Sequence, residues 1–327
     1  MTQPILSVII PAYNVENYIG EAVRSVQQQT FTNLEIIVIN DGSTDNTGQV
    51  IDEFAKDPRI VVIHQKNQGT SACRNIGQDV AHGKYVGFLD GDDLWMPEHA
   101  QKHIEVLSGN HEIDMTGSWW RIINENGLDT GRTGKPKKKW IQVEDLIREN
   151  ILSGTSNVVL TRAAIDKAGW FDPELVAAVD LDLYIRVSLL RRGNIYCIPE
   201  VLTEYRLHQG QITKDWRRMA FNWELVIEKA RCKCPQTVCN VEDEARARFL
   251  RFLAHLAYEA GDFSSCRTLL GHAFRKGTKY LYIDSRTWVT AFAAMLTFLP
   301  HSVHFLIADT IRSARSAMSP RKETRFI

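Results

Sequence analysis

The sequence predicts an α/β domain, with a mostly parallel β-sheet and helices on both faces, followed by a helical C-terminal region. Two patterns support this prediction. In the first 90 residues, short β-branched apolar runs alternate with longer amphipathic stretches, which is typical of buried parallel strands joined by helices. Beyond about residue 213 no convincing strand pattern remains, and the stretches are typical of successive helices.

The N-terminal part supplies strands and helices in alternation. The strands are expected at 6–10, 35–39, 59–64 and 84–89, and the helices near 17–29, 45–56 and 69–81. Ser43, Thr44 and Asp45 offer N-cap side chains in front of the second of these helices. The order strand, helix, strand predicts that the sheet is parallel here.

Between about residues 97 and 212 the pattern is mixed, and afterwards it becomes helical. The middle part predicts helix 97–107, strand 113–123, a Gly/Lys-rich loop 127–139, helix 143–151, strand 157–161, helix 180–191 and strand 195–198. The last part predicts helices at 215–232, 241–260 and 262–275, and then an apolar stretch at 286–317 with a basic end. We therefore expect two domains, 1–212 and 213–327.

Composition narrows the classes of function. Lys plus Arg and Asp plus Glu both number 39, so no net positive charge points to nucleic acid as a partner. The six cysteines do not form a disulfide framework, and the scattered Cys73, Cys197 and Cys266 favour free thiols in a reducing cytosol. The other three, at 232, 234 and 239, lack the paired spacing of a zinc site. Because the N-terminus lacks the pattern of a signal peptide, we expect the domain on the cytoplasmic side.

Polar side chains follow three of the predicted strands, at the carboxyl edge where open parallel sheets bind ligands. These strand ends read Pro11-Ala12-Tyr13-Asn14, Asn40-Asp41-Gly42-Ser43 and Asp90-Gly91-Asp92-Asp93. Clustered carboxylates repel one another unless a cation or a donor lies among them. Hard oxygen ligands at this spacing suit Mg²⁺ or Mn²⁺ together with a phosphate-bearing ligand. The alternative is a set of turns in which Asp and Gly only satisfy backbone groups.

Several motifs along the chain resemble the family 2 glycosyltransferases. They occur in the family's order within about residues 5–210, and they are Ser7-Val8-Ile9-Ile10-Pro11-Ala12-Tyr13-Asn14, Gln29-Thr30-Phe31, Asn40-Asp41-Gly42-Ser43-Thr44-Asp45, Asn67-Gln68-Gly69, Ala72-Cys73-Arg74-Asn75-Ile76-Gly77 and Phe88-Leu89-Asp90-Gly91-Asp92-Asp93-Leu94-Trp95. The resemblance implies the GT-A fold, a nucleotide-sugar donor and inversion at the anomeric carbon of the transferred sugar.

The resemblance also implies roles for the residues that bind the nucleotide. The turn at Pro11, Ala12 and Tyr13 would hold the base, with Tyr13 as a stacking face. Asp41 would accept an N–H of uracil, and its neighbour Asn40 stands where the family often has a second Asp. The alternative for these residues is a well-packed turn without a ligand.

For the rest of the donor, the resemblance implies that Asp90 contacts the ribose and Asp92 holds the metal, with Asp93 able to share either role. Arg74, on the helix after Asn67-Gln68-Gly69, would reach the diphosphate, or else it forms a surface ion pair.

Two carboxylates, Asp180 and Asp182, are candidates for the base that inversion by direct displacement requires. Residues two apart on a helix point in different directions, so only one of them can face the sugar. Asp182 has Arg186 four residues on, which is the spacing of a helix ion pair, so Asp180 is the preferred base. The segment resembles the family's Glu-Asp-Trp-Asp-Leu-Trp, from which Val179 and Leu181 depart.

Three further features are weaker candidates. The segment Tyr205-Arg206-Leu207-His208 resembles another family segment. His208 would bind the metal, or it would bind the diphosphate together with the cation of Arg206. The alternative is that His208 lies in a solvated loop. Trp119 and Trp120 are expected acceptor contacts, although at least one of such a pair normally packs in the core. A basic loop either attracts a phosphorylated or lipid-diphosphate acceptor or is simply solvated, and it contains Lys135, Lys137, Lys138 and Lys139.

The apolar stretch from Trp288 to Ile307 is interrupted by Pro300, His301 and His304. A spanning helix, an interfacial helix and a buried core or dimer helix are therefore all open, with the interfacial one preferred. The basic residues behind this stretch favour an anionic membrane surface, and they are Arg312, Arg315, Arg321, Lys322 and Arg325.

Together these features predict an inverting, metal-dependent glycosyltransferase at the inner face of the membrane. Its donor would be a nucleotide-diphosphate sugar, with UDP favoured, and its acceptor a hydroxyl of a glycan or lipid-linked molecule in cell-surface polysaccharide or glycoconjugate synthesis. The alternative from another class is a non-catalytic nucleotide-sugar-binding or scaffold protein. A nucleotidyltransferase would need a Gly-rich basic loop after the first strand, and a dinucleotide oxidoreductase would need G-x-G-x-x-G there, but Pro11-Ala12-Tyr13-Asn14 supplies neither. The oligomeric state stays open.

Overall fold

The computed structural model describes residues 3–190 and 193–298. The strands are β1 (Leu6–Ala12), β2 (Leu34–Asn40), β3 (Ile60–His64), β4 (Tyr85–Phe88), β5 (Leu94–Trp95), β6 (Ile113–Asn124), β7 (Asp129–Gly134), β8 (Trp140–Ile141), β9 (Val158–Thr161) and β10 (Asn194–Leu207). The α-helices are α1 (Ile19–Gln27), α2 (Thr47–Asp52), α3 (Thr70–Val80), α4 (His99–Gly109), α5 (Val143–Arg148), α6 (Arg162–Ala168), α7 (Val179–Ser188), α8 (Trp216–Lys233), α9 (Pro235–Glu259), α10 (Phe263–Leu281) and α11 (Ser285–Leu296).

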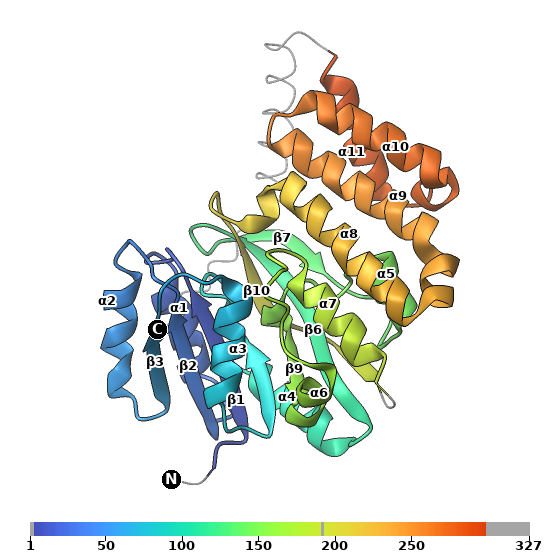
Figure 1. Ribbon diagram of the computed structural model, residues 1–327. Coiled ribbons are helices and arrows are strands. Elements are labelled where there is room, and N and C mark those ends of the chain that lie inside the picture. Colours follow the sequence, from blue (N-terminus) through green and yellow to red (C-terminus); the bar gives the residue numbers. More distant parts are fainter. Residues whose placement is uncertain (1–2, 191–192, 299–327) are drawn as a thin grey trace.

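The described strands form one sheet in the order β3-β2-β1-β4-β9-β6-β10-β5, with β7 beside β6 and β8 beside β10. The segment β3-β2-β1-β4 is parallel, whereas β9 runs antiparallel to both of its neighbours. Figure 1 shows helices packed around this sheet and α8 to α11 stacked beyond it. The predicted α/β class with a helical C-terminal region is confirmed.

Strand β1 explains why helices cover both faces of the sheet, since all seven of its residues are buried. Alternate side chains of a strand point to opposite faces. Ile9 therefore packs in one core with Cys73 of α3, while Ile10 packs in the other core with Ile19 of α1. The continuous apolar pattern of this strand is what a parallel strand buried on two sides requires.

The structure differs from the predicted elements mainly at β7 and β10, two strands that pair with β6. Strand β10 extends far beyond the predicted 195–198, because the ladder continues past a register shift between Ile198 and Val201. Pro199 and Glu200 are exposed at this irregularity and interrupt the apolar alternation that a prediction depends on. Strand β7 lies in the predicted loop 127–139, and its exposed Gly- and Thr-rich sequence carries no strand signal.

The C-terminal helices share a core with the sheet domain. Trp223 and Val226 of α8 and Val241 of α9 lie in the same apolar cluster as Leu146 and Ile147 of α5. This packing does not test a division of the chain near residue 212, which stays a prediction.

Within the part of the chain that the structure describes, no helix is long and apolar enough to cross a membrane. The end of the apolar stretch, with Pro300, His301 and His304, and the basic residues from Arg312 to Arg325 lie outside the described residues.

Candidate functional site

The polar turns at the ends of β1 and β2 are tied together by hydrogen bonds. The backbone N–H of Thr44 donates to Asn14 Oδ1 at 2.8 Å, and the N–H of Asn14 donates to Ser43 Oγ at 3.1 Å. Asn14 has a φ of 51°, a left-handed conformation that asparagine tolerates better than most residues. Because β2, β1 and β4 are neighbours in the sheet, the three predicted polar strand ends lie at one edge, as expected.

Asp41 holds the loop that leads into α3. Its Oδ1 accepts from Gln65 Nε2 at 2.7 Å and from the backbone N–H of Gln68 at 2.8 Å, and its Oδ2 accepts from the N–H of Gly69 at 2.8 Å. The residue is buried. A carboxylate offers about four acceptor positions, so Oδ2 keeps room for one further donor, such as a nucleobase N–H.

The neighbouring turn presents one aromatic ring to solvent. Tyr13 is 48% exposed, whereas Pro11 and Ala12 are buried as the last residues of β1. Ala12 uses its carbonyl oxygen to accept the backbone N–H of Asp41 at 2.9 Å. Of the three predicted base contacts in this turn, Tyr13 alone therefore offers a side-chain face for stacking.

Arg74 joins α3 to the first aspartate after β4. Its Nη2 donates to Asp90 Oδ1 at 2.5 Å, and its guanidinium lies 5.3 Å from the ring centre of Phe171. Nε and Nη1 are buried and have no hydrogen-bond partner among the described residues. Since buried donors are nearly always paired, these two nitrogens point to an anionic ligand.

Close packing of α3 on the sheet puts Arg74 in this position. A Cβ atom built on Gly77, one turn further along α3, would lie 2.5 Å from Ile9 Cγ2 of β1. The absence of a side chain at Gly77 therefore lets the helix approach the strand, so that Arg74 reaches the end of β4.

Asp92 and His208, two of the predicted metal ligands, lie together in the structure. His208 Nε2 lies 2.8 Å from Asp92 Oδ2, and the imidazole packs 4.9 Å from the ring of Tyr18. Among the described residues no group of three or more His, Cys, Asp or Glu side chains could hold a metal by itself. Mg²⁺ and Mn²⁺ sites commonly use one or two protein ligands and take the others from substrate phosphates and water, so this donor set suits such an ion.

Asp93, the other predicted metal ligand, is buried and hydrogen-bonded within the protein. It is 1% exposed, its Oδ2 accepts from Ser156 Oγ at 2.6 Å, and its Oδ1 accepts from the backbone N–H of Arg206 at 2.9 Å. Burial raises the pKa of Asp93 well above its usual value, and the nearby carboxylates Asp92 and Asp90 add to this effect. Both carboxylate oxygens of Asp93 therefore accept hydrogen bonds inside the protein.

Arg206 is also bound within the protein, and it does not present the free cation that its motif suggested. Its Nε donates to the carbonyl oxygen of Asp92 at 2.8 Å, and its Nη2 pairs with Glu21 at 2.6 Å. The guanidinium also lies 5.0 Å from the ring centre of Tyr18. Arg206 thus braces the backbone that carries Asp92.

The two aspartates of α7 face different surroundings. Asp182 is buried and pairs with Arg186 at 2.9 Å, as its spacing predicts, and with Lys229 at 3.1 Å. Asp180 is half-buried in the first turn of the helix and accepts from Asn150 Nδ2 at 2.5 Å. Burial raises the pKa of Asp180, and this effect outweighs the opposing influence of Asn150 and Arg74.

The candidate acceptor residues lie on β6 and the loop beyond β7. Trp119 packs against the core and donates Nε1–H to the carbonyl of Pro136 at 3.3 Å, while Lys135 lies over its ring. Trp120 is half-buried and lies against Gly134. Of the other loop lysines, Lys138 pairs with Asp145 of α5 at 2.6 Å.

Sequence reasoning did not find Asn150, Ser156 or Tyr18. Each touches a predicted site residue from a distant part of the chain, and the separation is 30 residues for the pair of Asn150 with Asp180 and 63 for the pair of Ser156 with Asp93. No spacing rule in a single sequence signals contacts of this length.

Comparison with known proteins finds relatives that are named as glycosyltransferases. The family model for glycosyl transferase family 2 matches residues 7–169. An uncharacterized glycosyltransferase of Haemophilus influenzae is 36% identical, over 64% of this chain and 67% of that protein. The putative teichuronic acid biosynthesis glycosyltransferase TuaG of Bacillus subtilis is 30% identical, over 68% of this chain and 86% of that protein. The UDP-Glc:alpha-D-GlcNAc-diphosphoundecaprenol beta-1,3-glucosyltransferase WfgD of Escherichia coli is 29% identical, over 69% and 87%.

Two solved structures have a similar fold. Residues 1–349 of TarS from S. aureus, in complex with UDP-GlcNAc, match with a TM-score of 0.57 and 20% identity, over 84% of this chain and 92% of that one. The mannosyltransferase PcManGT from Pyrobaculum calidifontis, in complex with GDP-Man and Mn²⁺, matches with a TM-score of 0.60 and 16% identity, over 98% and 89%. At these identities the likeness shows the fold, which is of the GT-A type.

Proposed function

The chain belongs to glycosyl transferase family 2, and we propose that it transfers a sugar with inversion, in a metal-dependent reaction, from a nucleotide-diphosphate donor to a hydroxyl of a glycan or lipid-linked acceptor. The favoured donor is a UDP-sugar, and the product belongs to cell-surface polysaccharide or glycoconjugate. One observation carries the proposal. Arg74 pairs with Asp90 and lies close enough to Asp180 to affect its pKa. Two of its buried nitrogens have no partner among the described residues, so they could bind a diphosphate that lies between these carboxylates.

The donor would lie across the carboxyl ends of β1, β2 and β4. Tyr13 would stack on the base, and the remaining lone pair of Asp41 Oδ2 would accept a base N–H. Asp90 would contact the ribose, and Arg74 would bind the diphosphate through its two free nitrogens. Asp92 and His208 would hold Mn²⁺ or Mg²⁺, which neutralises the negative charge of the leaving diphosphate.

The transfer itself is a single displacement with Asp180 as the base. Asp180 takes the proton of the acceptor hydroxyl, and the hydroxyl oxygen forms a bond to the anomeric carbon of the sugar. The bond from that carbon to the diphosphate oxygen breaks on the opposite face, so the configuration inverts. The raised pKa of Asp180 suits this role, because a base works best when its pKa approaches the working pH.

The proposed acceptor is supported by the relatives and by the surface around β6. The name of WfgD states an acceptor sugar on diphosphoundecaprenol, a lipid-linked substrate. Trp119 and Trp120 would contact the acceptor sugar, and Lys135, beside Trp119, would attract a phosphate group on it.

Replacing Arg74 by Met tests the observation on which the proposal depends. We expect the affinity for UDP with Mn²⁺ to fall roughly 10- to 100-fold, since hydrogen bonds to charged groups contribute about 1.5–3 kcal/mol. The affinity for uridine, which lacks phosphates, should stay unchanged, and calorimetry measures both. Equal UDP binding by the variant and the wild type would remove Arg74 from the donor site. A wild type that releases no nucleoside diphosphate from UDP-glucose, UDP-N-acetylglucosamine or GDP-mannose with any acceptor would favour the non-catalytic alternative.

The proposal includes peripheral contact with the inner face of the membrane through α10 and α11. Exposed apolar side chains gather around α11, and they are Tyr282, Ile283, Trp288, Val289, Phe292, Met295 and Phe298. Helix α10 beside it carries Arg267, Arg275, Lys276 and Lys279 and no acidic residue. Apolar and basic groups side by side suit an anionic lipid surface.

Replacing Trp288 and Phe292 together by Glu is expected to abolish flotation of the protein with phosphatidylglycerol vesicles. The wild type should float at low salt and less at high salt, because screening weakens the basic contribution. Phe221→Glu is the matched control, since Phe221 is an exposed aromatic residue of α8. Flotation of the double variant equal to that of the wild type would contradict the membrane contact.

A further inference from the structure

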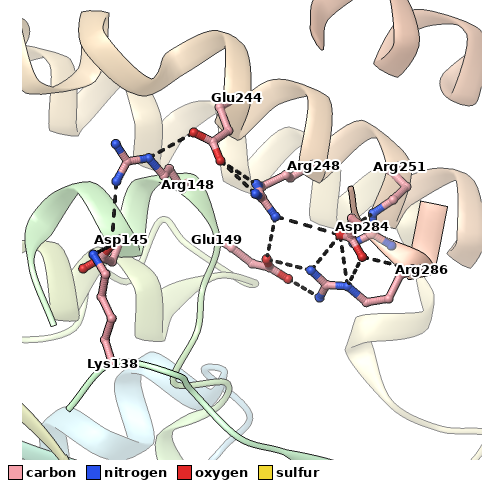
Figure 2. Close-up of polar contacts among 9 residues, drawn as sticks. All are labelled: Lys138, Asp145, Arg148, Glu149, Glu244, Arg248, Arg251, Asp284 and Arg286. Carbon is pink, nitrogen blue, oxygen red and sulfur yellow. Dashed lines mark hydrogen bonds and ion pairs between the residues drawn. The ribbon is translucent and has the colours of Figure 1, made fainter. Parts of the chain in front are cut away.

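The connection between α5 and β9, residues 149–157, is held at its first residue by the C-terminal helices. Glu149 bonds Arg286 of α11 through two oxygens, at 2.5 and 3.0 Å, and lies 3.6 Å from Arg248 of α9. Arg286 also pairs with Asp284 at 2.8 Å. Figure 2 shows Arg248 and Arg286 reaching Glu149 from the C-terminal helices, with Asp284 beside both arginines. The start of the connection is thus tied to a charged network of the C-terminal region.

The rest of this connection contacts the carboxylates of the site. Asn150, next to Glu149, donates to Asp180 at 2.5 Å. The Oγ of Ser156 accepts the backbone N–H of Asp90 at 3.0 Å and donates to Asp93. A single short segment therefore joins the C-terminal helices, the proposed base and the aspartates after β4.

The hydrogen bond between Asn150 and Asp180 fixes how the carboxylate is oriented. Asn150 donates to Oδ2 of Asp180 from the connection, across 30 residues of chain. The Oδ1 of Asn150 is itself buried without a partner among the described residues, so the bond to Asp180 is the side-chain hydrogen bond that holds this amide. We infer that Asn150 is a positioning residue for Asp180 and that the ion pair of Glu149 with Arg286 holds it in place from the C-terminal helices. This inference rests on the proposed function, in which Asp180 is the base.

The groups around Asp180 determine in which direction its pKa should move when the Asn150 donor is removed. Burial opposes the charged carboxylate, while Asn150, the backbone N–H of Leu181 and Arg74 of α3 favour it. Tyr184 of α7 also faces Asp180, and Asp90 acts on Tyr184 from beyond Arg74. Removing the Asn150 donor takes away one of the groups that stabilise the charged carboxylate, while burial still destabilises it. Asp180 should therefore hold its proton to a higher pH. The acidic limb of the turnover profile should then move to higher pH.

Replacing Asn150 by Leu removes the amide while it keeps a similar volume. The titration of Asp180 is followed by infrared spectroscopy of protein with ¹³C-labelled aspartate, and Asp180→Asn identifies the band. We expect the titration midpoint and the acidic limb of UDP release from a UDP-sugar to move up together, with the affinity for UDP and Mn²⁺ unchanged. An unmoved midpoint would overturn the inference and leave the proposed function standing. If this variant does not fold, Asn150→Asp keeps the shape and should raise the midpoint as well, since two neighbouring carboxylates share a proton.

Replacing Arg286 by Gln tests the remote part of the inference. Arg246→Gln is the matched control, because Arg246 pairs with two oxygens of Glu224, at 2.5 and 2.9 Å, within the C-terminal helices and away from the connection. We expect Arg286→Gln to move the Asp180 midpoint in the same direction as Asn150→Leu, and Arg246→Gln to leave it in place. Equal midpoints in the two arginine variants would overturn the role of the Glu149 pair. Unchanged turnover in Asp180→Asn would instead remove the proposed base.

Discussion

Replacing Asp180 by Asn is expected to lower the turnover number for sugar transfer by about 10²–10⁴-fold, the usual contribution of general acid–base catalysis. The amide keeps the shape of the side chain but cannot take the proton of the acceptor hydroxyl. UDP binding should persist, because Arg74 and the pair of Asp92 with His208, which would bind the diphosphate and its metal, are unchanged. Turnover is measured as UDP release and affinity by calorimetry.

The matched control lies two residues away on the same helix. Asp182→Asn should act on stability, because it leaves the buried guanidinium of Arg186 without its carboxylate, whereas Lys229 keeps its pair with Asp172. Breaking a buried ion pair costs about 3–5 kcal/mol of unfolding free energy. If Asp182→Asn lost turnover at unchanged stability while Asp180→Asn stayed active, the two assignments would have to be exchanged.

The pH dependence of stability gives the Asp180 variant a second signature. A carboxyl whose pKa is raised in the folded state binds its proton more tightly there than in the unfolded chain. The carboxyl therefore contributes less to the free energy of unfolding as the pH rises from its unfolded pKa to its folded pKa. Above both values the charged carboxylate lowers the stability by the full amount that the pKa shift represents. Because burial raises the pKa of Asp180, Asp180→Asn should be more stable relative to wild type at pH 7 than at about pH 4. Urea unfolding at the two pH values measures this difference.

Replacing Asp92 by Ala is expected to abolish metal-dependent binding of UDP. Asp92 and His208 are the protein's contribution to the proposed metal site, and the variant leaves the imidazole alone. The affinity for UDP in Mn²⁺ should fall more than about 100-fold, since even an outer-shell partner of a metal costs roughly 10- to 100-fold. In EDTA the variant and the wild type should bind UDP with equal, weak affinity.

Calorimetry with UDP, GDP and TDP, each with Mn²⁺ and with EDTA, measures this effect and the base preference together. Asp79→Ala serves as the control, because Asp79 is an exposed aspartate of α3. UDP binding that is equally tight with Mn²⁺ and with EDTA in the wild type would contradict the proposed metal dependence. Tighter binding of GDP than of UDP would change the proposed donor but not the site.

The sequence by itself predicted the α/β class and the edge of the sheet where the chemistry lies. Strand burial follows a local pattern, as in β1, and polar residues after parallel strands must meet at one edge because the strands share a direction. The ion pair of Asp182 with Arg186 was equally predictable, because it depends only on helix spacing. The full length of β10 was not predictable from the sequence, since a bulge at Pro199 and Glu200 interrupts the alternation of its apolar residues.

The tertiary structure alone decided which of the predicted polar atoms remain available. Asp92 and Asp93 are adjacent and chemically identical in the sequence, yet Asp93 is committed to Ser156 and to the backbone of Arg206, while Asp92 meets His208. In the same way Asn150 reaches Asp180 across 30 residues. The sequence determines which groups the site contains, but hydrogen bonds between distant residues determine which lone pairs are already used. Those bonds form only when the chain has folded, so a single sequence does not reveal them.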